Sequence, residues 1–185
     1  VHGIPTSTPL VAGDIVSLDM GVVLEGFYGD SAITLPVGDI PGRVSNLLRV
    51  TKESLDLAIE QVQVNGYLSD IGHVVQRHVE AHGFSVVREF VGHGIGTKLH
   101  EDPQIPNYGD PGNGPRLEAG MVLAIEPMVT LGKPAVKVLD DGWTAVTRDG
   151  SLAAHFEHTV AVTEMGPEVL TRCAGRMASS EADAL

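Results

Sequence analysis

The stretch VSLDMGVVLEGFYGDSAITL, residues 16–35, contains two apolar runs separated by a short turn. This pattern predicts a β-hairpin of two antiparallel strands. Asp19 lies in the first run and Asp30 in the second. A two-residue turn at Leu24 and Glu25 would place these acids directly opposite each other, although a three-residue loop that includes Gly26 is the alternative. A buried carboxylate is unfavourable without a partner, so the hairpin predicts a compensating group between the two acids.

An internal repeat extends this pattern to a second pair of acids. The segment LVAGDIVSLD, residues 10–19, aligns with LEAGMVLAIE, residues 117–126, and each segment ends on an acid. The segment DSAITL, which begins at Asp30, is likewise similar to EHTVAV, which begins at Glu157. We therefore expect two hairpins related by a pseudo-repeat, each with one acid on its outgoing strand and one on its returning strand. A repeat by itself indicates only a duplicated fold.

Four inward-facing acids need positive charge between them. Protonation can relieve the repulsion of one close pair but is a poor solution for four. Two divalent cations suit them better, and an imidazole would complete such a site. His93 is the expected imidazole, because the glycines on both sides let the backbone approach closely. Taken singly, each aspartate could instead be a helix or turn cap, or part of a solvent-facing sheet edge. Taken together, the four acids and the histidine favour a metal site, and the predicted ligands are Asp19, Asp30, His93, Glu126 and Glu157.

The remaining sequence predicts a mixture of helices and strands. Apolar periodicity predicts a helix over 44–62 and a second helix that begins at a Ser69 cap and ends before Gly83. Residues 101–116 are rich in Gly, Pro and Asn and predict a surface loop. Further strands are expected at 85–91, 121–125, 135–139, 143–147 and 152–163.

Composition limits the class of protein. With 185 residues and 43% hydrophobic content, residues 1–172 suit one domain, and 173–185 are expected to form a disordered tail. The net charge of −12 argues against nucleic-acid binding. No apolar run reaches the roughly 20 residues of a membrane helix, and no signal peptide is visible. The single cysteine, Cys173, excludes an internal disulfide and is typical of a reducing compartment, which predicts a cytoplasmic protein.

Several other enzyme motifs can be set aside. The GHGIG segment lacks the spacing and the Lys-Ser/Thr pair of a phosphate-binding loop. The chain contains neither the HExxH motif of zinc proteases nor the GxSxG motif of serine hydrolases. His78 and His82 lie four residues apart on the second predicted helix and are interpreted as solvated side chains.

Taken together, the motifs resemble those of type I methionine aminopeptidases. They are VHGIP, LDMGVVLEGFYGDSA, VGHGIGTKLHEDP, GMVLAIEPM and DGWTAVTRDGSLAAHFEHTVAVTE, in this order from Val1 to Arg172. The resemblance implies the pita-bread fold of creatinases and aminopeptidases, an α+β fold in which a pseudo-two-fold antiparallel sheet packs on helices. It also implies that the five predicted ligands bind two divalent metal ions, which could be Mn, Fe, Co or Zn.

The resemblance further implies a function and roles for individual residues. The expected reaction is removal of the N-terminal methionine from nascent proteins and peptides, by a monomeric enzyme without a membrane partner. Asp30 and Glu157 would bridge both ions, Asp19 would chelate one, and His93 with Glu126 would bind the other. Glu126 would also carry a proton to the leaving amine. His100 would contact the substrate backbone, and His2 would orient the scissile amide or leaving group.

Three residues are expected near the substrate. By resemblance, Trp143 and Leu99 help to wall the methionine pocket, although plain core packing would explain both. His155 stands where the family carries a glutamine. Because side chains alternate along a strand, His155 shares a face with Glu157 and is expected to line the site.

The beginning of the chain departs from the family pattern. Family members carry a helix and strands before the HGIP segment, and these are missing from the given sequence, which also lacks an initiator methionine. We therefore expect an N-terminally truncated catalytic domain with an exposed sheet edge.

Two alternatives remain open at this point. The first is a proline-specific aminopeptidase or dipeptidase of the same fold, although that class usually has an Arg-x-Glu-Asp run around its last ligand. Here the last ligand, Glu157, lies in HFEHT. The second is a non-catalytic pita-bread binding module, but such a relative should have lost ligands, and all five are present.

Overall fold

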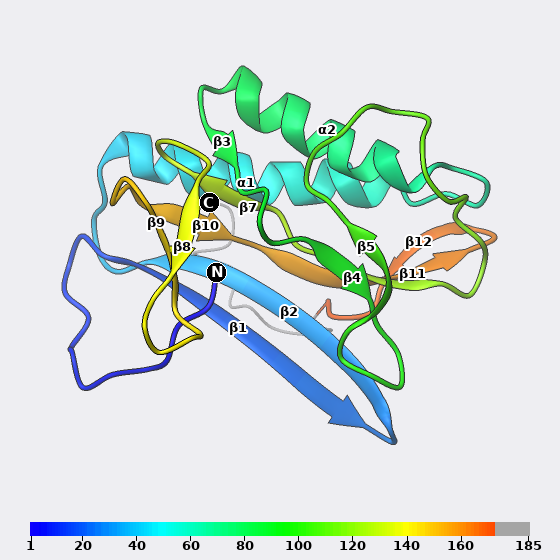
Figure 1. Ribbon diagram of the computed structural model, residues 1–185, viewed down its shortest axis with the longest axis horizontal. Helices are drawn as coiled ribbons and strands as arrows, with labels where there is room; N and C mark the ends of the chain where they lie inside the picture. Colours follow the sequence, from blue (N-terminus) through cyan, green and yellow to red (C-terminus); the bar gives the residue numbers. More distant parts are fainter. Residues whose placement is uncertain (173–185) are drawn as a thin grey trace.

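The computed structural model describes residues 1–172, so the predicted tail at 173–185 lies outside the described residues. A seven-stranded antiparallel sheet forms the framework (Figure 1). In spatial order its strands are β1 (Ile15–Leu24), β2 (Phe27–Pro36), β11 (Glu157–Thr163), β6 (Val122–Ile125), β4 (Gly92–Gly94) and β5 (Glu101–Ile105), and β12 (Gly166–Val169) pairs with β11.

Two helices and two smaller sheets complete the structure. The helices α1 (Gly42–Glu60) and α2 (Leu68–Ala81) confirm the two predicted helices and, with the sheet, the predicted α+β class. One small sheet contains β10 (Ala153–His155), β7 (Met128–Thr130) and β3 (Ser85–Val86), and the other pairs β8 (Val136–Val138) with β9 (Ala145–Thr147). In the described part of the chain, no helix is long and apolar enough to cross a membrane.

The hydrophobic core lies between the helices and one face of the large sheet. Leu47 of α1 and Val75 of α2 are fully buried in the same cluster as Leu123, Ile125 and Val160 of the sheet. These sheet residues alternate with residues that point to the opposite face, so one face packs on the helices and the other remains available for a site. Figure 1 shows both helices on one side of the sheet.

The first hairpin is confirmed, but both predicted turns are wrong. The turn residues are Glu25 and Gly26, both with positive φ, and Leu24 pairs with Phe27. A two-residue turn that needs two positive φ angles favours glycine at its second position, which shifts the turn by one residue. As a result, Asp19 faces Ala32 instead of Asp30. The shift is two residues along β2, so both acids still point to the same face of the sheet.

The repeat seen in the sequence is present in space. β1 pairs with β2, β6 pairs with β11, and β2 lies next to β11 at the centre. The two repeated strand pairs therefore meet through their returning strands, which carry Asp30 and Glu157. The second pair is not the predicted hairpin, because β7 to β10 lie between β6 and β11 in the chain. This arrangement confirms the predicted pseudo-two-fold sheet and brings one acid from each half to the central seam.

Threonine hydroxyls hold this seam together. Only two residue pairs join β2 to β11 in the strand register. On one side of these pairs, the Thr159 Oγ1 donates to the Asp30 carbonyl and accepts from the Asp30 N–H, both at 2.8 Å. On the other side, the Thr34 Oγ1 donates to the His155 carbonyl at 2.8 Å and accepts from its N–H at 2.9 Å. Each buried hydroxyl thus replaces a missing pair of main-chain hydrogen bonds.

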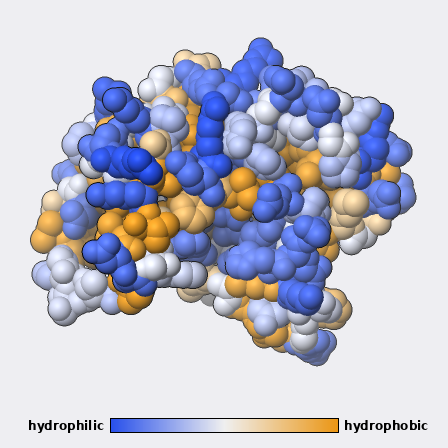
Figure 2. All heavy atoms as spheres, viewed as in Figure 1, coloured by the Kyte–Doolittle hydropathy of each residue, from blue (hydrophilic) through white to orange (hydrophobic). Residues whose placement is uncertain are grey.

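The helices cover only one half of the pseudo-symmetric sheet. Ile125 and Val160 are 1% and 0% exposed beneath the helices. Their repeat equivalents, Leu18 and Ile33, are 45% and 38% exposed. β1 is an edge strand of the described sheet, as expected. Apolar side chains gather at the projecting end of this hairpin (Figure 2), where Leu24 and other apolar residues are exposed.

Other strand boundaries differ from the sequence predictions. β5 lies inside the predicted loop 101–116, because it pairs with the short strand β4. The predicted strand 152–163 is broken at Phe156, where the chain leaves the pairing with β7 and enters the large sheet. The predicted strand 85–91 is paired only at Ser85–Val86, and β7 and β12 were not predicted. Such short strands depend on distant partners and leave little trace in local sequence.

The predicted Ser69 cap of the second helix is also wrong. α2 begins at Leu68, and the Asp70 carboxylate accepts a hydrogen bond from the backbone N–H of Tyr67 at 3.2 Å. Ser69 instead accepts through its Oγ from the backbone N–H of Asn113 at 2.8 Å. Its hydroxyl therefore anchors the loop that follows β5.

The threonine seam generates a testable prediction. Replacing Thr159 with valine keeps the shape of the side chain but leaves the buried N–H and carbonyl of Asp30 without this partner. We expect the free energy of unfolding to fall by roughly 1–3 kcal/mol, as measured by urea denaturation. The exposed Thr8→Val change is the control and should have little effect. Equal stabilities of Thr159→Val and Thr8→Val would show that the hydroxyl does not hold the seam.

Candidate metal centre

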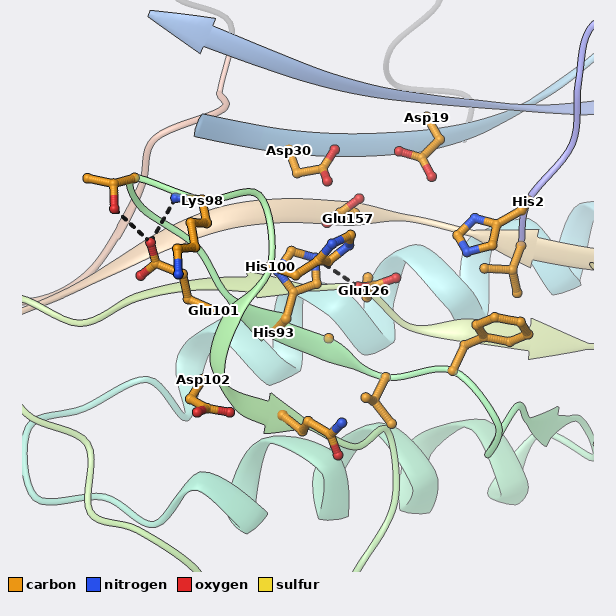
Figure 3. A pocket seen from close by; sticks show the side chains of 16 residues that line it. His2, Asp19, Asp30, His93, Lys98, His100, Glu101, Asp102, Glu126 and Glu157 are labelled. Carbon is orange, nitrogen blue, oxygen red and sulfur yellow. Dashed lines mark hydrogen bonds and ion pairs between the residues drawn. The ribbon is translucent and has the colours of Figure 1, made fainter. Parts of the chain in front are cut away.

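A cavity of about 750 Å³ opens on the face of the large sheet opposite the helices. Strands from both halves of the repeat contribute to its wall. Figure 3 shows Asp19 and Asp30 of the first hairpin on one side of it and Glu126 and Glu157 of the second strand pair on the other. All five predicted ligands line this cavity, together with His2 and His100: Asp19, Asp30, His93, Glu126 and Glu157.

Three of the predicted ligands form a tight cluster. Asp30 on β2, His93 on β4 and Glu157 on β11 are all buried, and one ligand atom from each lies within 4.8 Å of the others. These residues come from three different strands and from both halves of the repeat. A carboxylate pair with an imidazole at this spacing can bind a divalent cation. The structure therefore contains a candidate metal site where the sequence predicts one.

The local contacts of His93 leave one nitrogen available for a cation. Its Nδ1 lies 2.9 Å from the backbone carbonyl of Gly94. A carbonyl can only accept a hydrogen bond, so Nδ1 carries the hydrogen. In the neutral ring, Nε2 then has a lone pair, and it lies 3.5 Å from the Oε1 of Glu126. This is the tautomer that a metal ligand needs.

The glycines around His93 permit this placement. A Cβ on Gly92 would lie 2.4 Å from the carbonyl oxygen of Ala124, and one on Gly94 would lie 2.1 Å from that of Asp102. Both distances are shorter than any real contact, so the neighbouring strands can approach β4 only because these side chains are absent. The predicted close approach of the backbone is thus explained by strand packing on both sides of His93.

Glu126 and Asp19 lie beside the three-residue cluster. Glu126 directly follows β6, and its side chain is largely buried between two imidazoles. One residue further along the β6–β11 register, Glu126 stands opposite Glu157. Asp19 on β1 is more open, with 36% of its side chain exposed. The shifted hairpin register places it diagonally from Asp30, as described above.

Three acids of the cavity, Glu157, Glu126 and Asp19, have raised pKa values. Burial, reinforced by the nearby charges of Glu126, Asp30 and Asp19, raises the pKa of Glu157 to about 10. Burial also raises the pKa of Glu126 to about 8, against the opposing effect of His93. Asp19 shifts in the same direction, again chiefly through burial. The ionised forms of these acids therefore need added positive charge.

A divalent cation would provide that charge, and the residues fit one. The Oε1 of Glu157 is buried and has no hydrogen-bond partner among the described residues. A buried carboxylate oxygen without a partner is unusual in a folded protein and is typical of a missing ion or water. Four carboxylates with one imidazole form an oxygen-rich donor set that suits divalent metals.

The two predicted substrate-contacting histidines line the same cavity. The ring of His100 packs edge-on against that of His93, with 4.4 Å between their centroids. The His2 ring stacks on Trp143 with 4.4 Å between centroids, and its edge meets Phe90 at 5.3 Å. Partial burial lowers the pKa of His2, which favours its neutral ring. An imidazole carries at least one N–H in either protonation state, so both histidines can offer an N–H group to a molecule in the cavity.

The three predicted pocket residues are next to residues that line the cavity but do not themselves line it. Trp143 supports His2 from the side, as its stacking shows. Leu99 packs against β1 at Gly21. A Cβ atom added to this glycine would lie 3.4 Å from the Cδ1 of Leu99. His155 is buried behind Glu126 and Asp19. Their assignment to a substrate pocket stays a prediction.

Some supporting residues were missed from the sequence. The buried Asn107 donates through Nδ2 to the backbone carbonyl of Glu126 at 3.0 Å. Thr159 and Thr34 hold the seam that carries Asp30. Nothing local distinguishes an asparagine in a Pro- and Gly-rich segment from an ordinary turn residue, so only the three-dimensional structure reveals its role.

Comparisons with known proteins agree with this site. The family model of metallopeptidase family M24 matches residues 1–164. The methionine aminopeptidase of Clostridium perfringens is 58% identical over 171 residues, which are 92% of this chain and 69% of that protein. Methionine aminopeptidase 1 of Bacillus subtilis is 57% identical over 172 residues, or 93% and 69% of the two chains. The chain thus spans about two thirds of the length of these relatives.

Solved structures show the same similarity. The methionine aminopeptidase of Thermotoga maritima superposes with a TM-score of 0.86 and 55% identity over 88% of this chain and 65% of its own. The methionine aminopeptidase of Rickettsia prowazekii has a TM-score of 0.90 and 44% identity, over 92% of this chain and 69% of its own. The prolidase of Pyrococcus furiosus, at 22% identity and a TM-score of 0.73, shares the fold alone. The predicted pita-bread fold is confirmed.

The raised pKa values predict how pH affects the metal-free protein. Between about pH 7 and 9 the folded state retains protons on Glu157 and partly on Glu126, whereas the unfolded chain has already released them. The free energy of unfolding should therefore fall as pH rises, by up to about 1.4 kcal/mol per pH unit for each retained proton. Urea denaturation after treatment with a chelator measures this slope.

Two comparisons make this test specific. The double variant Glu126→Gln and Glu157→Gln cannot retain these protons, so its slope should be flatter. Excess Mn²⁺ should restore stability at pH 9, because a cation binds the deprotonated acids. A metal-free protein that becomes more stable across this pH range would contradict the prediction.

Proposed function

The chain belongs to metallopeptidase family M24, and we propose that it removes the N-terminal methionine from nascent proteins and peptides by metal-dependent hydrolysis. The observation that carries this proposal is the convergence of the five predicted metal ligands and two histidines on one cavity. The chain spans about two thirds of its methionine aminopeptidase relatives, which are 57–58% identical over that part.

The sequence around the last ligand supports this function over its rivals. A proline-specific enzyme of the same fold is the first rival, but the sequence of the Pyrococcus furiosus prolidase is only 22% identical to this chain. Glu157 lies in HFEHT and not in an Arg-x-Glu-Asp run. A non-catalytic module is the second rival, and the buried, unpartnered Oε1 of Glu157 argues against it. In a protein that does not bind metal, a buried carboxylate oxygen without a hydrogen-bond partner would only lower stability.

The metal-binding residues have distinct proposed roles. Asp30 and Glu157, on the two strands that meet at the centre of the sheet, would hold divalent metal together with His93. Asp19 and Glu126, beside this cluster, would contribute further carboxylate ligands. Divalent ions supply Lewis acidity and lower the pKa of water, which is the chemistry that amide hydrolysis requires. Imidazole and carboxylate ligands together admit Mn, Fe, Co or Zn.

The protein's own side chains would handle the proton and the developing charge. Glu126 lies at the cavity with Oε1 toward His93, and we assign to it the transfer of a proton to the leaving amine. His100 would donate a hydrogen bond to the substrate backbone from the neighbouring wall. His2, held by Trp143, would orient the scissile amide or leaving group. Donors aimed at an oxygen that gains charge lower the barrier of acyl transfer.

The remaining parts of this proposal concern the surroundings of the enzyme. Its substrate would be the N-terminus of a nascent chain, which enters the open cavity. A monomeric state, a cytoplasmic location and the use of two ions are proposed with the activity and await measurement.

Peptide cleavage tests the function directly. The protein with Mn²⁺ or Co²⁺ should release free methionine from Met-Ala-Ser and leave Xaa-Pro peptides intact. Cleavage only before proline would support the proline-specific enzyme. Absence of both metal binding and cleavage would support the non-catalytic module. The measurement is chromatographic detection of the free amino acid.

A histidine variant tests the assigned roles. His100→Ala should lower kcat/KM by about 10²- to 10³-fold, because it removes a donor that stabilises developing charge. Its free energy of unfolding should barely change, since His100 is exposed. His82→Ala, at an exposed histidine directly after α2, is the control and should retain full activity. Equal activities of the two variants would remove His100 from the mechanism.

A further inference from the structure

His155 occupies an unusual position behind the metal-binding side chains. It ends β10 and is 3% exposed. Its Nε2 lies 3.4 Å from the Oε2 of Glu126, and its Nδ1 lies 3.9 Å from the Oδ2 of Asp19. The ring therefore stands between two predicted ligands, one from each half of the repeat.

No other group explains this burial. Among the described residues, neither ring nitrogen of His155 has a hydrogen-bond partner of ordinary geometry. Burying a polar ring without partners destabilises a fold, so an imidazole that only filled space here would be inferior to an apolar side chain. The two carboxylates are the polar groups that the ring faces.

The backbone of His155 is held firmly. The Thr34 hydroxyl bonds to both its N–H and its carbonyl, as described for the seam. On the other side, β10 pairs with β7 with His155 opposite Met128. A side chain with so fixed a backbone has few positions to adopt, which suits a group that orients another.

Glu126 is thereby flanked by two imidazoles. Its Oε1 lies 3.5 Å from the Nε2 of His93, and its Oε2 lies 3.4 Å from the Nε2 of His155. The Asn107 amide holds its backbone carbonyl. The two carboxylate oxygens are thus divided, one toward the cluster of Asp30, His93 and Glu157 and one toward the buried ring.

We propose that His155 is a positioning residue that holds the Oε2 of Glu126 through Nε2–H, so that Oε1 is presented to the cation beside His93. The inference rests on the proposed metal site but not on the peptide substrate. Nε2 is the donor because Glu126 is nearer than Asp19 and more buried, which makes its hydrogen bond more valuable. Hydrogen bonds to ligating carboxylates typically contribute 10- to 100-fold to metal affinity.

Two substitutions separate a hydrogen-bond donor from a space-filling ring. His155→Gln keeps an N–H donor on a side chain of similar reach, whereas His155→Leu keeps only the apolar volume. Titration calorimetry with Mn²⁺ on the full chain should show affinity close to that of the original protein for His155→Gln. It should show about 10- to 100-fold weaker binding for His155→Leu. If both variants bind as the original protein does, or both weaken equally, the proposal is overturned.

A second measurement distinguishes orientation from a purely structural role. Neither ring nitrogen of His155 has a hydrogen bond of ordinary geometry in the structure. We expect the Nε2–H bond to Glu126 to form fully only when a cation engages Oε1, so without metal His155→Leu should unfold at an equal or higher urea concentration. A structural role predicts the opposite, namely lower stability. His155→Met provides a second apolar replacement if the leucine variant does not fold, since methionine adapts to irregular spaces.

His158→Leu is the matched control. His158 lies on β11 only one residue from Glu157, but its Nδ1 bonds to the Thr171 hydroxyl at 2.8 Å, and it does not face Glu126. Metal affinity should be unchanged in this variant. If the His155 variants behave as expected but no peptide is cleaved, the proposed function fails while this inference stands. Absence of Mn²⁺ binding by the original protein would overturn the inference itself.

Discussion

The burial of carboxylates close to one another is the constraint on which the rest of this structure depends. Four acids from the two halves of the repeat are brought to one cavity, and burial together with the neighbouring charges raises the pKa of Glu157 to about 10. Placing buried, ionised carboxylates together without a cation lowers the free energy of unfolding. The arrangement is understandable as a site that is stable when it binds divalent metal, which is what metallopeptidases of family M24 require.

The supporting structure serves this arrangement at several levels. Glycines on both sides of His93 allow three strands to come close enough for its Nε2 to reach the acids. Threonine hydroxyls replace main-chain hydrogen bonds where β2 and β11 separate, so Asp30 and Glu157 stay together across the join between the halves. The buried His155 then spans Glu126 and Asp19 from behind. The threonine and histidine contacts link residues that are far apart in the chain, so the site is a product of tertiary packing.

The two halves of the sheet have the same strands but different surroundings. Helices α1 and α2 bury the outer face of the β6–β11 pair, while the equivalent face of the first hairpin is exposed along Leu18 and Ile33. The face that carries the candidate metal ligands is common to both halves. The proposed catalytic geometry therefore depends on the shared inner face of the sheet.

The sequence by itself determined which side chains share a face, because alternation along a strand and the internal repeat are local properties. It therefore identified the acids, His93, the two helices and the family. Only the tertiary structure decided the hairpin register, because that depends on which residues of the turn adopt positive φ. The pairing of β5, the break at Phe156 and the burial of His155 were likewise beyond the sequence. Each is set by a partner strand or side chain far away in the chain, and local patterns carry no information about such partners.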